Sequence, residues 1–184
     1  MTPPRGEAYY LGNGGGLWGC LVYFSRGSGS LFSGDSYLSV DDKGRLAIPA
    51  KHRDGLRDSC ASQMVITVDP GSKERCLLLY PQNEWRMVVE QLKAMPNANP
   101  DANTFRRLFV GRSVQLDMDK QGRILLPGKH REYAGLSSQV VLVGLINKFE
   151  IWDEGLWSES CESWGEKLDL TSMDTESPLG KLSY

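Results

Sequence analysis

Short apolar runs, separated by segments that contain glycine, proline or aspartate, extend along the chain from residue 36 to residue 152. Apolar runs bounded by turn residues are typical of buried strands. They predict strands at 36–40, 45–48, 64–68, 76–80, 114–118, 123–126, 140–143 and 148–152. Helices are expected over 51–56, 81–95, 101–110, 129–134 and 153–168. We therefore expect a β-rich α+β protein.

One segment of the sequence is repeated with an offset of 78 residues, so the order of expected elements occurs twice. Residues 40–54 match residues 118–132, with identities at Asp41, Gly44, Arg45, Pro49, Lys51, His52 and Arg53. Residues 63–68 and 76–80 then match 139–144 and 148–152. One copy is too small to bury a stable core alone. We therefore expect the two copies to be halves of one small barrel, related by a pseudo-twofold axis.

Each copy is expected to open with a β-hairpin. Asp41 and Gly44 in the first copy, and Asp119 and Gly122 in the second, supply the turn, because glycine adopts a positive φ without strain. Pro49 and Pro127 end the strand that follows, since proline donates no hydrogen bond to a strand ladder. These are the expected structural residues of the hairpins.

The chain divides into six expected parts. They are an N-terminal extension (1–33), a first repeat (34–81), a helical connector (82–111), a second repeat (112–155), a C-terminal helix (156–168) and an acidic tail (169–184). The tail is polar and predicts disorder. The longer helices have apolar residues at helical spacing, which are Trp85, Val88, Val89 and Leu92, and Leu156, Trp157, Cys161, Trp164 and Leu168.

The formal net charge of −2 conceals an uneven distribution. Residues 153–184 hold eight acids and two bases, which leaves a charge of +4 on residues 1–152. The cysteines (Cys20, Cys60, Cys76 and Cys161) have neither CxxC spacing nor a repeated pattern. We interpret them as reduced thiols of a cytoplasmic protein, without a disulfide framework or a zinc site.

These features together resemble the MraZ family, whose members carry two SpoVT/AbrB-like swapped-hairpin units. The resemblance rests on the doubled DxxxR motif, Asp41 to Arg45 and Asp119 to Arg123, and on residues 46–53 and 125–136. It covers about residues 31–165. It implies a double-split β-barrel with peripheral helices and a ring-shaped homo-oligomer. It also implies binding to direct repeats upstream of a division and cell-wall gene cluster that includes the protein's own gene, usually as a repressor.

Chains of that family normally begin with Met-Phe-x-Gly before the first strand. Here the corresponding segment is Leu31-Phe32-Ser33-Gly34, after thirty additional residues. We interpret these additional residues as disordered or as an artefact of start assignment, with Leu31 as the initiator position. Recovery of peptides from residues 1–30 of the native protein would exclude the artefact.

Double-stranded DNA is the expected partner, and the hairpin tips are the expected binding elements. Arginine offers a planar fork suited to phosphate or guanine, and a two-stranded β-element fits the major groove. The basic residues after each hairpin would mainly hold phosphates. The candidate DNA-binding residues are Lys43, Gly44, Arg45, Lys51, Arg53, Lys120, Arg123, Lys129 and Arg131.

Alternatives exist for several of these residues. Asp41 with Arg45, and Asp119 with Arg123, could be ion pairs that only stabilise each hairpin. We favour this role for the acids, because a carboxylate repels phosphate, and the family resemblance favours DNA contact for the arginines. No second histidine or cysteine accompanies His52 or His130, so packing or phosphate contact is favoured over metal binding. The tryptophans have spacings that favour core or subunit packing over base stacking.

No catalytic motif occurs in the sequence, and two histidines leave little scope for acid–base chemistry, so we expect no enzyme activity, cofactor or small-molecule substrate. No apolar stretch near the start could span a bilayer. We expect a cytoplasmic, nucleoid-associated regulator. The competing functions are a swapped-hairpin antitoxin, although such antitoxins have one copy per chain, and a ring-forming scaffold without base readout.

Overall fold

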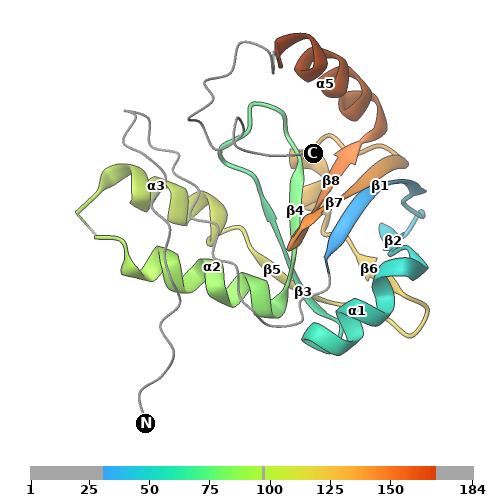
Figure 1. Ribbon diagram of the computed structural model, residues 1–184, viewed down its shortest axis with the longest axis horizontal. Helices are drawn as coiled ribbons and strands as arrows, with labels where there is room; N and C mark the ends of the chain where they lie inside the picture. The colour runs from blue at the N-terminus through green and yellow to red at the C-terminus, as the bar shows by residue number, and fades with distance from the viewer. Residues whose placement is uncertain (1–30, 97, 169–184) are drawn as a thin grey trace, which may run out of the picture.

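The computed structural model describes residues 31–96 and 98–168 (Figure 1). The first strand begins at Phe32, two residues before the predicted start of the first repeat. The rest of the N-terminal extension and the acidic tail lie outside the described residues. Predictions about these two segments are therefore not tested.

Every strand and helix expected within the described residues is present. The first half contains β1 (Phe32–Ser39), β2 (Arg45–Ala47), α1 (Ala50–Cys60), β3 (Gln63–Val68), β4 (Leu77–Pro81) and α2 (Gln82–Ala94). The second half contains α3 (Pro100–Phe109), β5 (Val114–Asp117), β6 (Arg123–Leu125), α4 (Gly128–Tyr133), β7 (Gln139–Ile146), β8 (Lys148–Asp153) and α5 (Glu154–Lys167). The prediction of an α+β protein is confirmed.

Each of the two sheets contains strands from both repeats. The six-stranded sheet has the order β1-β7-β8-β4-β3-β5, and β2 pairs with β6 in a separate two-stranded sheet. If each strand is replaced by its counterpart in the other repeat (β1 by β5, β3 by β7 and β4 by β8), the order becomes the same order counted from the opposite edge of the sheet. The arrangement therefore has a pseudo-twofold axis. Equivalent residues face each other in the centre of the small sheet, where Leu46 pairs with Ile124. The repeats are therefore halves of one structure.

The predicted hairpins differ from the observed pairing. A tight turn does connect β1 to β2, and a single bridge joins Val40 to Leu46. However, β1 forms its ladder with β7, and β2 forms its ladder with β6, so the long ladders lie between the repeats. The turn residues predict the turn but not the strand with which β1 or β2 pairs. That strand is selected by core packing with residues far away in the sequence. The strand pairs of the described part of the chain do not show a closed barrel.

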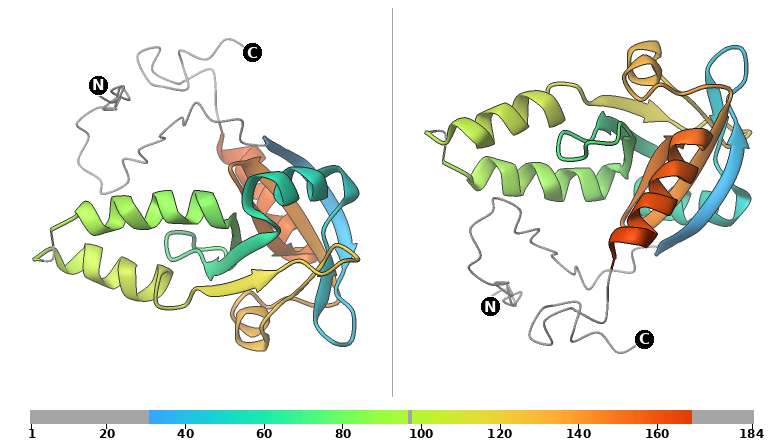
Figure 2. Two further views of the ribbon diagram at one scale, coloured as in Figure 1. Left: turned by 90° about the horizontal axis from the view of Figure 1, so that it is seen from below. Right: turned by 90° about the horizontal axis from the view of Figure 1, so that it is seen from above.

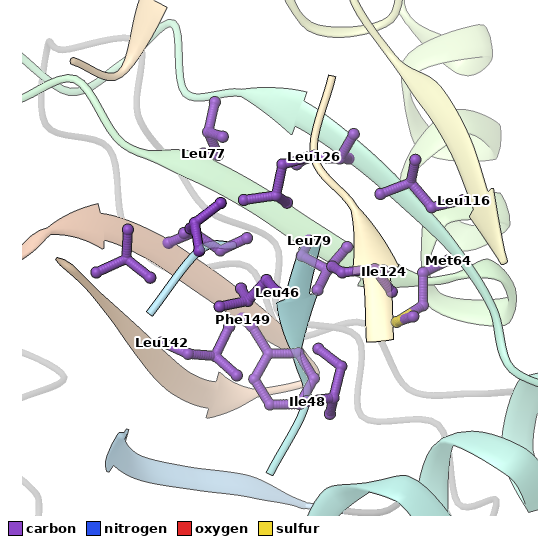
Figure 3. Close-up of a cluster of buried hydrophobic side chains, with 14 of the residues drawn as sticks. Leu46, Ile48, Met64, Leu77, Leu79, Leu116, Ile124, Leu126, Leu142 and Phe149 are labelled. Atoms are coloured by element: carbon purple, nitrogen blue, oxygen red, sulfur yellow. The ribbon is translucent and has the colours of Figure 1, made fainter. Parts of the chain in front are cut away.

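One core lies between the small sheet and the large sheet (Figure 3). Leu46 and Ile48 from the β2 side, and Ile124 and Leu126 from the β6 side, point toward side chains of the large sheet, among them Phe149. All five side chains are at most 1% exposed. Burying a side chain of this size stabilises the fold by about 2 kcal/mol, so this core holds the two repeats together.

A second core covers the opposite face of the large sheet. Trp85 of α2 stacks on Phe109 of α3, with ring centroids 5.1 Å apart. The two helices lie side by side and project from the sheets as an arm (Figure 2). Arg106 of α3 joins them, because it donates hydrogen bonds to the Leu92 and Met95 carbonyls at the end of α2. The central strands are buried on both faces, which explains their continuous apolar runs.

Helix α5 buries less of its apolar face than its spacing suggests. Trp157 and Trp164 pack on Trp152, with ring centroids 5.7 and 5.5 Å away. Cys161 is exposed, and Leu168 lies beyond the end of the helix. The tryptophans therefore serve packing, as their spacing predicts, whereas Cys161 and Leu168 are not part of the core.

Candidate nucleic-acid interface

Two similar turns connect β1 to β2 and β5 to β6. The Asp41 Oδ1 atom accepts hydrogen bonds from the backbone N–H groups of Lys43 (3.0 Å) and Arg45 (2.9 Å). The Gly44 N–H donates to the Asp41 carbonyl, and Gly44 has a φ of +79°. Asp119 and Gly122, with a φ of +78°, repeat this geometry in the second turn. The turn depends on an aspartate at its first position and a glycine at its fourth.

Each turn aspartate also holds the arginine that follows it. The Asp41 Oδ2 atom lies 2.7 Å from both Nε and Nη2 of Arg45. The corresponding distances between Asp119 and Arg123 are 3.1 Å. The Arg45 backbone N–H is the largest cause of a lowered pKa of Asp41, and the Arg123 backbone N–H lowers the pKa of Asp119 in the same way. The structure thus contains both ion pairs that the sequence suggests.

The two arginines lie on the outer face of the β2–β6 ribbon. Leu46 and Ile124 point into the core, so the residues on either side of them point outward. These are Arg45 and Ala47 on β2, and Arg123 and Leu125 on β6. Leu125 is 56% exposed and pairs with Arg45. One two-stranded element therefore presents both motif arginines, one from each repeat.

Arg53 and Arg131 are candidate DNA contacts, and their side chains connect the two repeats. Arg53 donates from Nε to the Ile48 carbonyl (2.7 Å) and lies over Gly122 of the other repeat. Arg131 donates to the Leu126 carbonyl (3.3 Å) and lies over Gly44. The sequence interpretation left space above these glycines for DNA, but an arginine side chain of the protein occupies that space.

Backbone hydrogen bonds reinforce the same contact. The Ile48 N–H donates to the Gly122 carbonyl (2.8 Å), and the Leu126 N–H donates to the Gly44 carbonyl (2.9 Å). Each turn is thus bound to the strand end of the opposite repeat. Pro49 and Pro127 follow those strand ends and precede α1 and α4.

Four candidate lysines are exposed to solvent. Lys43 and Lys120 lie in the turns, and Lys51 and Lys129 lie in the first turns of α1 and α4. Among them, Lys51 approaches the Ser33 carbonyl at 3.5 Å. These ammonium groups can reach a phosphate without breaking an ion pair found in the described part of the chain.

The two histidines are buried rather than aimed at a ligand. Each is 7% exposed. His52 packs against the rings of Phe32 and Phe149, and burial, followed by the charge of Lys51, lowers the pKa of His52. His130 Nε2 lies 2.8 Å from the Arg112 carbonyl oxygen. Both residues therefore have packing roles, one of the two roles that the sequence favours.

The sequence interpretation missed two exposed features. Leu125 was not a candidate, although an apolar side chain between two arginines can contact a thymine methyl group. Arg112 was not a candidate either, and its guanidinium lies 5.3 Å from the centre of the Tyr133 ring. The alternation of side chains along β6 could have identified Leu125 once the inward direction of Ile124 was known.

No helix in the described part of the chain is long and apolar enough to cross a membrane.

Comparisons with known proteins give a consistent result. The family described as "MraZ protein, putative antitoxin-like" matches residues 31–108 and 109–175. A protein of Thioalkalivibrio sulfidiphilus named transcriptional regulator MraZ is 44% identical over 142 residues, which are 77% of this chain and 93% of that protein. The proteins of the same name from Methylococcus capsulatus and Acidithiobacillus ferrooxidans are 40% and 45% identical, over 84% and 83% of this chain and 100% and 99% of their own lengths.

Proposed function

The chain belongs to the MraZ family, and we propose that it is a sequence-specific DNA-binding transcriptional regulator that reads DNA with the outer face of its β2–β6 ribbon. The name of the relatives is that of a regulator and not of an enzyme, in agreement with the sequence-based prediction. The observation that carries the proposal is the placement of Arg45 and Arg123 on one exposed two-stranded element.

The ion pairs support base readout because they orient the arginines. Asp41 and Asp119 accept hydrogen bonds from Nε and Nη2, and no hydrogen bond donated by Nη1 is found for either arginine within residues 31–96 and 98–168. A guanidinium held in this way loses less conformational entropy on binding. It can still present donors to guanine O6 and N7, whereas the lysines around the ribbon supply phosphate contacts.

The same proposal includes four more specific expectations that the family resemblance raises. They are a double-split arrangement of the barrel, a homo-oligomeric ring, association with the nucleoid and repression through direct repeats upstream of the gene cluster that contains the protein's own gene. Two β2–β6 ribbons on adjacent subunits, each with low affinity for DNA, would bind two adjacent DNA repeats at the same time. Such avidity raises the overall affinity without any new contact.

The phosphate contacts are tested by the salt dependence of DNA binding. Fluorescence anisotropy measures the affinity for a duplex from the upstream region and for a shuffled duplex at several salt concentrations. Lys51→Ala combined with Lys129→Ala should weaken both complexes and reduce the salt slope by about 2, since each phosphate contact contributes about 0.9. Lys93→Ala is the matched control, because Lys93 is an exposed lysine on the helical arm, paired with Glu90. An unchanged slope in the double variant would contradict the proposal.

The base contacts are tested by a substitution that retains charge. Arg123→Lys should reduce the preference for the upstream duplex over the shuffled duplex by about tenfold, since a bidentate contact discriminates by about 1–3 kcal/mol. Binding to the shuffled duplex should change little. An equal loss on both duplexes would mean that Arg123 only supports the fold or holds phosphate.

An antitoxin is the second candidate, and the description of the matching family includes that term. The two matched regions in one chain argue against it, because swapped-hairpin antitoxins have one copy per chain. Recovery of a stoichiometric partner protein that is released when the ribbon binds DNA would favour this candidate.

A further inference from the structure

Three potential ligand groups from distant parts of the sequence meet beside the second core. The Asp69 carboxylate, the Cys76 thiol and the Glu150 carboxylate each place an atom within 4.8 Å of the other two. The register of the sheet explains the meeting. Val68 of β3 pairs with Leu77 of β4, and Asp69 and Cys76 are the residues next to this pair on the two segments. On the neighbouring strand β8, Glu150 pairs with Leu78 of β4. Alternation along the strands puts all three side chains on the same face.

The thiol is enclosed by this arrangement. Cys76 is 1% exposed, and no hydrogen bond from another residue to its Sγ atom is found among the described residues. Burial, followed by the charges of Glu150 and Asp69, raises the pKa of the Cys76 thiol. The two carboxylates repel each other and oppose ionisation of the thiol between them, and a cation that joins the three groups would offset this repulsion.

Neighbouring donors orient both carboxylates. The Gly71 N–H donates to Asp69 Oδ1 (2.8 Å), and the Trp152 indole N–H donates to Glu150 Oε2 (3.0 Å). Outer hydrogen bonds of this type fix carboxylate ligands in known metal sites. Lys148 Nζ lies 3.5 Å from Glu150 Oε1. A thiolate, two carboxylates and this ammonium group together carry a charge of −2, which one divalent cation neutralises.

We propose that Asp69, Cys76 and Glu150 bind one zinc-type divalent cation, through the sulfur and one oxygen of each carboxylate, with water as the fourth ligand. Sulfur selects zinc over magnesium and calcium, which prefer oxygen ligands. Binding releases the thiol proton to solvent and forms the metal–sulfur bond. Zinc ligands at about 2.0–2.3 Å from the metal lie about 3.5 Å apart, so these atoms, which lie within 4.8 Å of one another, need to approach by at most about 1.3 Å. The ion would join the β3–β4 loop of the first repeat to β8 of the second.

Cobalt provides a direct test, because thiolate ligation produces a charge-transfer band in the near ultraviolet. The full chain is treated with a chelator, dialysed and titrated with Co²⁺. A variant in which Cys20, Cys60 and Cys161 are replaced by serine should show the band with a one-to-one endpoint, and Zn²⁺ should abolish it. The same chain with the additional change Cys76→Ser should show no band. Absence of the band before this change, or its persistence afterwards, overturns the proposal.

Two further variants keep the test valid if Cys76→Ser does not fold. Asp69→Asn and Glu150→Gln preserve size and should each weaken Co²⁺ binding at least tenfold. Zn²⁺ should raise the melting temperature of the wild-type chain and raise it less in these variants. Asp58→Asn is the matched control, since Asp58 is an exposed acid on α1. Equal Co²⁺ affinity in the wild-type chain, Asp69→Asn and Glu150→Gln overturns the proposal.

Discussion

Gly122→Ala should lower the free energy of unfolding through two separate effects. Gly122 has a φ of +78°, where an alanine costs about 1.5 kcal/mol, partly offset by about 0.5 kcal/mol from the lower entropy of the unfolded chain. The new methyl group would also lie 2.6 Å from Cδ of Arg53. Arg53 must then move and lose its hydrogen bond to the Ile48 carbonyl, a further loss of about 1.5 kcal/mol. The total is about 2.5 kcal/mol.

Gly135→Ala isolates the first effect. Gly135 has a φ of +59°, and no atom lies within 4 Å of the position that an alanine methyl group would take there. This variant should lose only about 1 kcal/mol. In an Arg53→Ala background, Gly122→Ala should likewise cost only about 1 kcal/mol, because no side chain then has to be displaced.

The assay is urea unfolding followed by tryptophan fluorescence, with all variants at one protein concentration. Equal losses for Gly122→Ala and Gly135→Ala would refute the contact between the repeats. So would a loss for Gly122→Ala that does not depend on Arg53.

Three further predictions concern stability. Hydrogen bonding lowers the pKa of Asp41 and Asp119 in the folded chain from the ordinary value of 3.8. Their contribution to the free energy of unfolding is therefore complete above the unfolded pKa and is lost as the pH falls below it. The double variant Asp41→Asn, Asp119→Asn should show a flatter decrease of stability below about pH 5. Burial lowers the pKa of His52 in the folded chain from 6.5. As the pH drops below 6.5, His52 takes up a proton in the unfolded chain before it does so in the folded chain, and the free energy of unfolding should fall. His52→Leu should remove this decrease, measured by chemical denaturation at several pH values. Leu46→Ala should cost about 3 kcal/mol in the same assay, because Leu46 is fully buried between the sheets.

Much of the fold could be predicted from local patterns. Continuous apolar runs located the strands, and the repeated turn predicted that Gly44 and Gly122 adopt a positive φ. The repeat itself indicated that the copies are halves of one structure, and the symmetric strand order agrees. These features depend on neighbouring residues or on comparison of two segments, and both are visible in the sequence.

The pairing between repeats could not be predicted in this way. A turn such as Asp41–Gly44 is compatible with a local hairpin and with an exchanged one, and only packing of the whole core selects β6 as the partner of β2. The same applies to Arg53, which is basic and half-buried, and which lies over a glycine sixty-nine positions later. Spacing likewise gave no indication of Asp69, Cys76 and Glu150, because the sheet register alone brings them together.

Photo-crosslinking from the ribbon tests DNA recognition most directly. Leu125 is exposed between the two arginines, so Leu125→p-benzoylphenylalanine places a photoreactive group on the proposed surface at little cost to the fold. The same replacement at Leu108, an exposed residue of the helical arm, is the control. The account predicts a crosslink to the upstream duplex from position 125, weaker with the shuffled duplex, and none from position 108. A crosslink from position 108 but not from position 125 would contradict it.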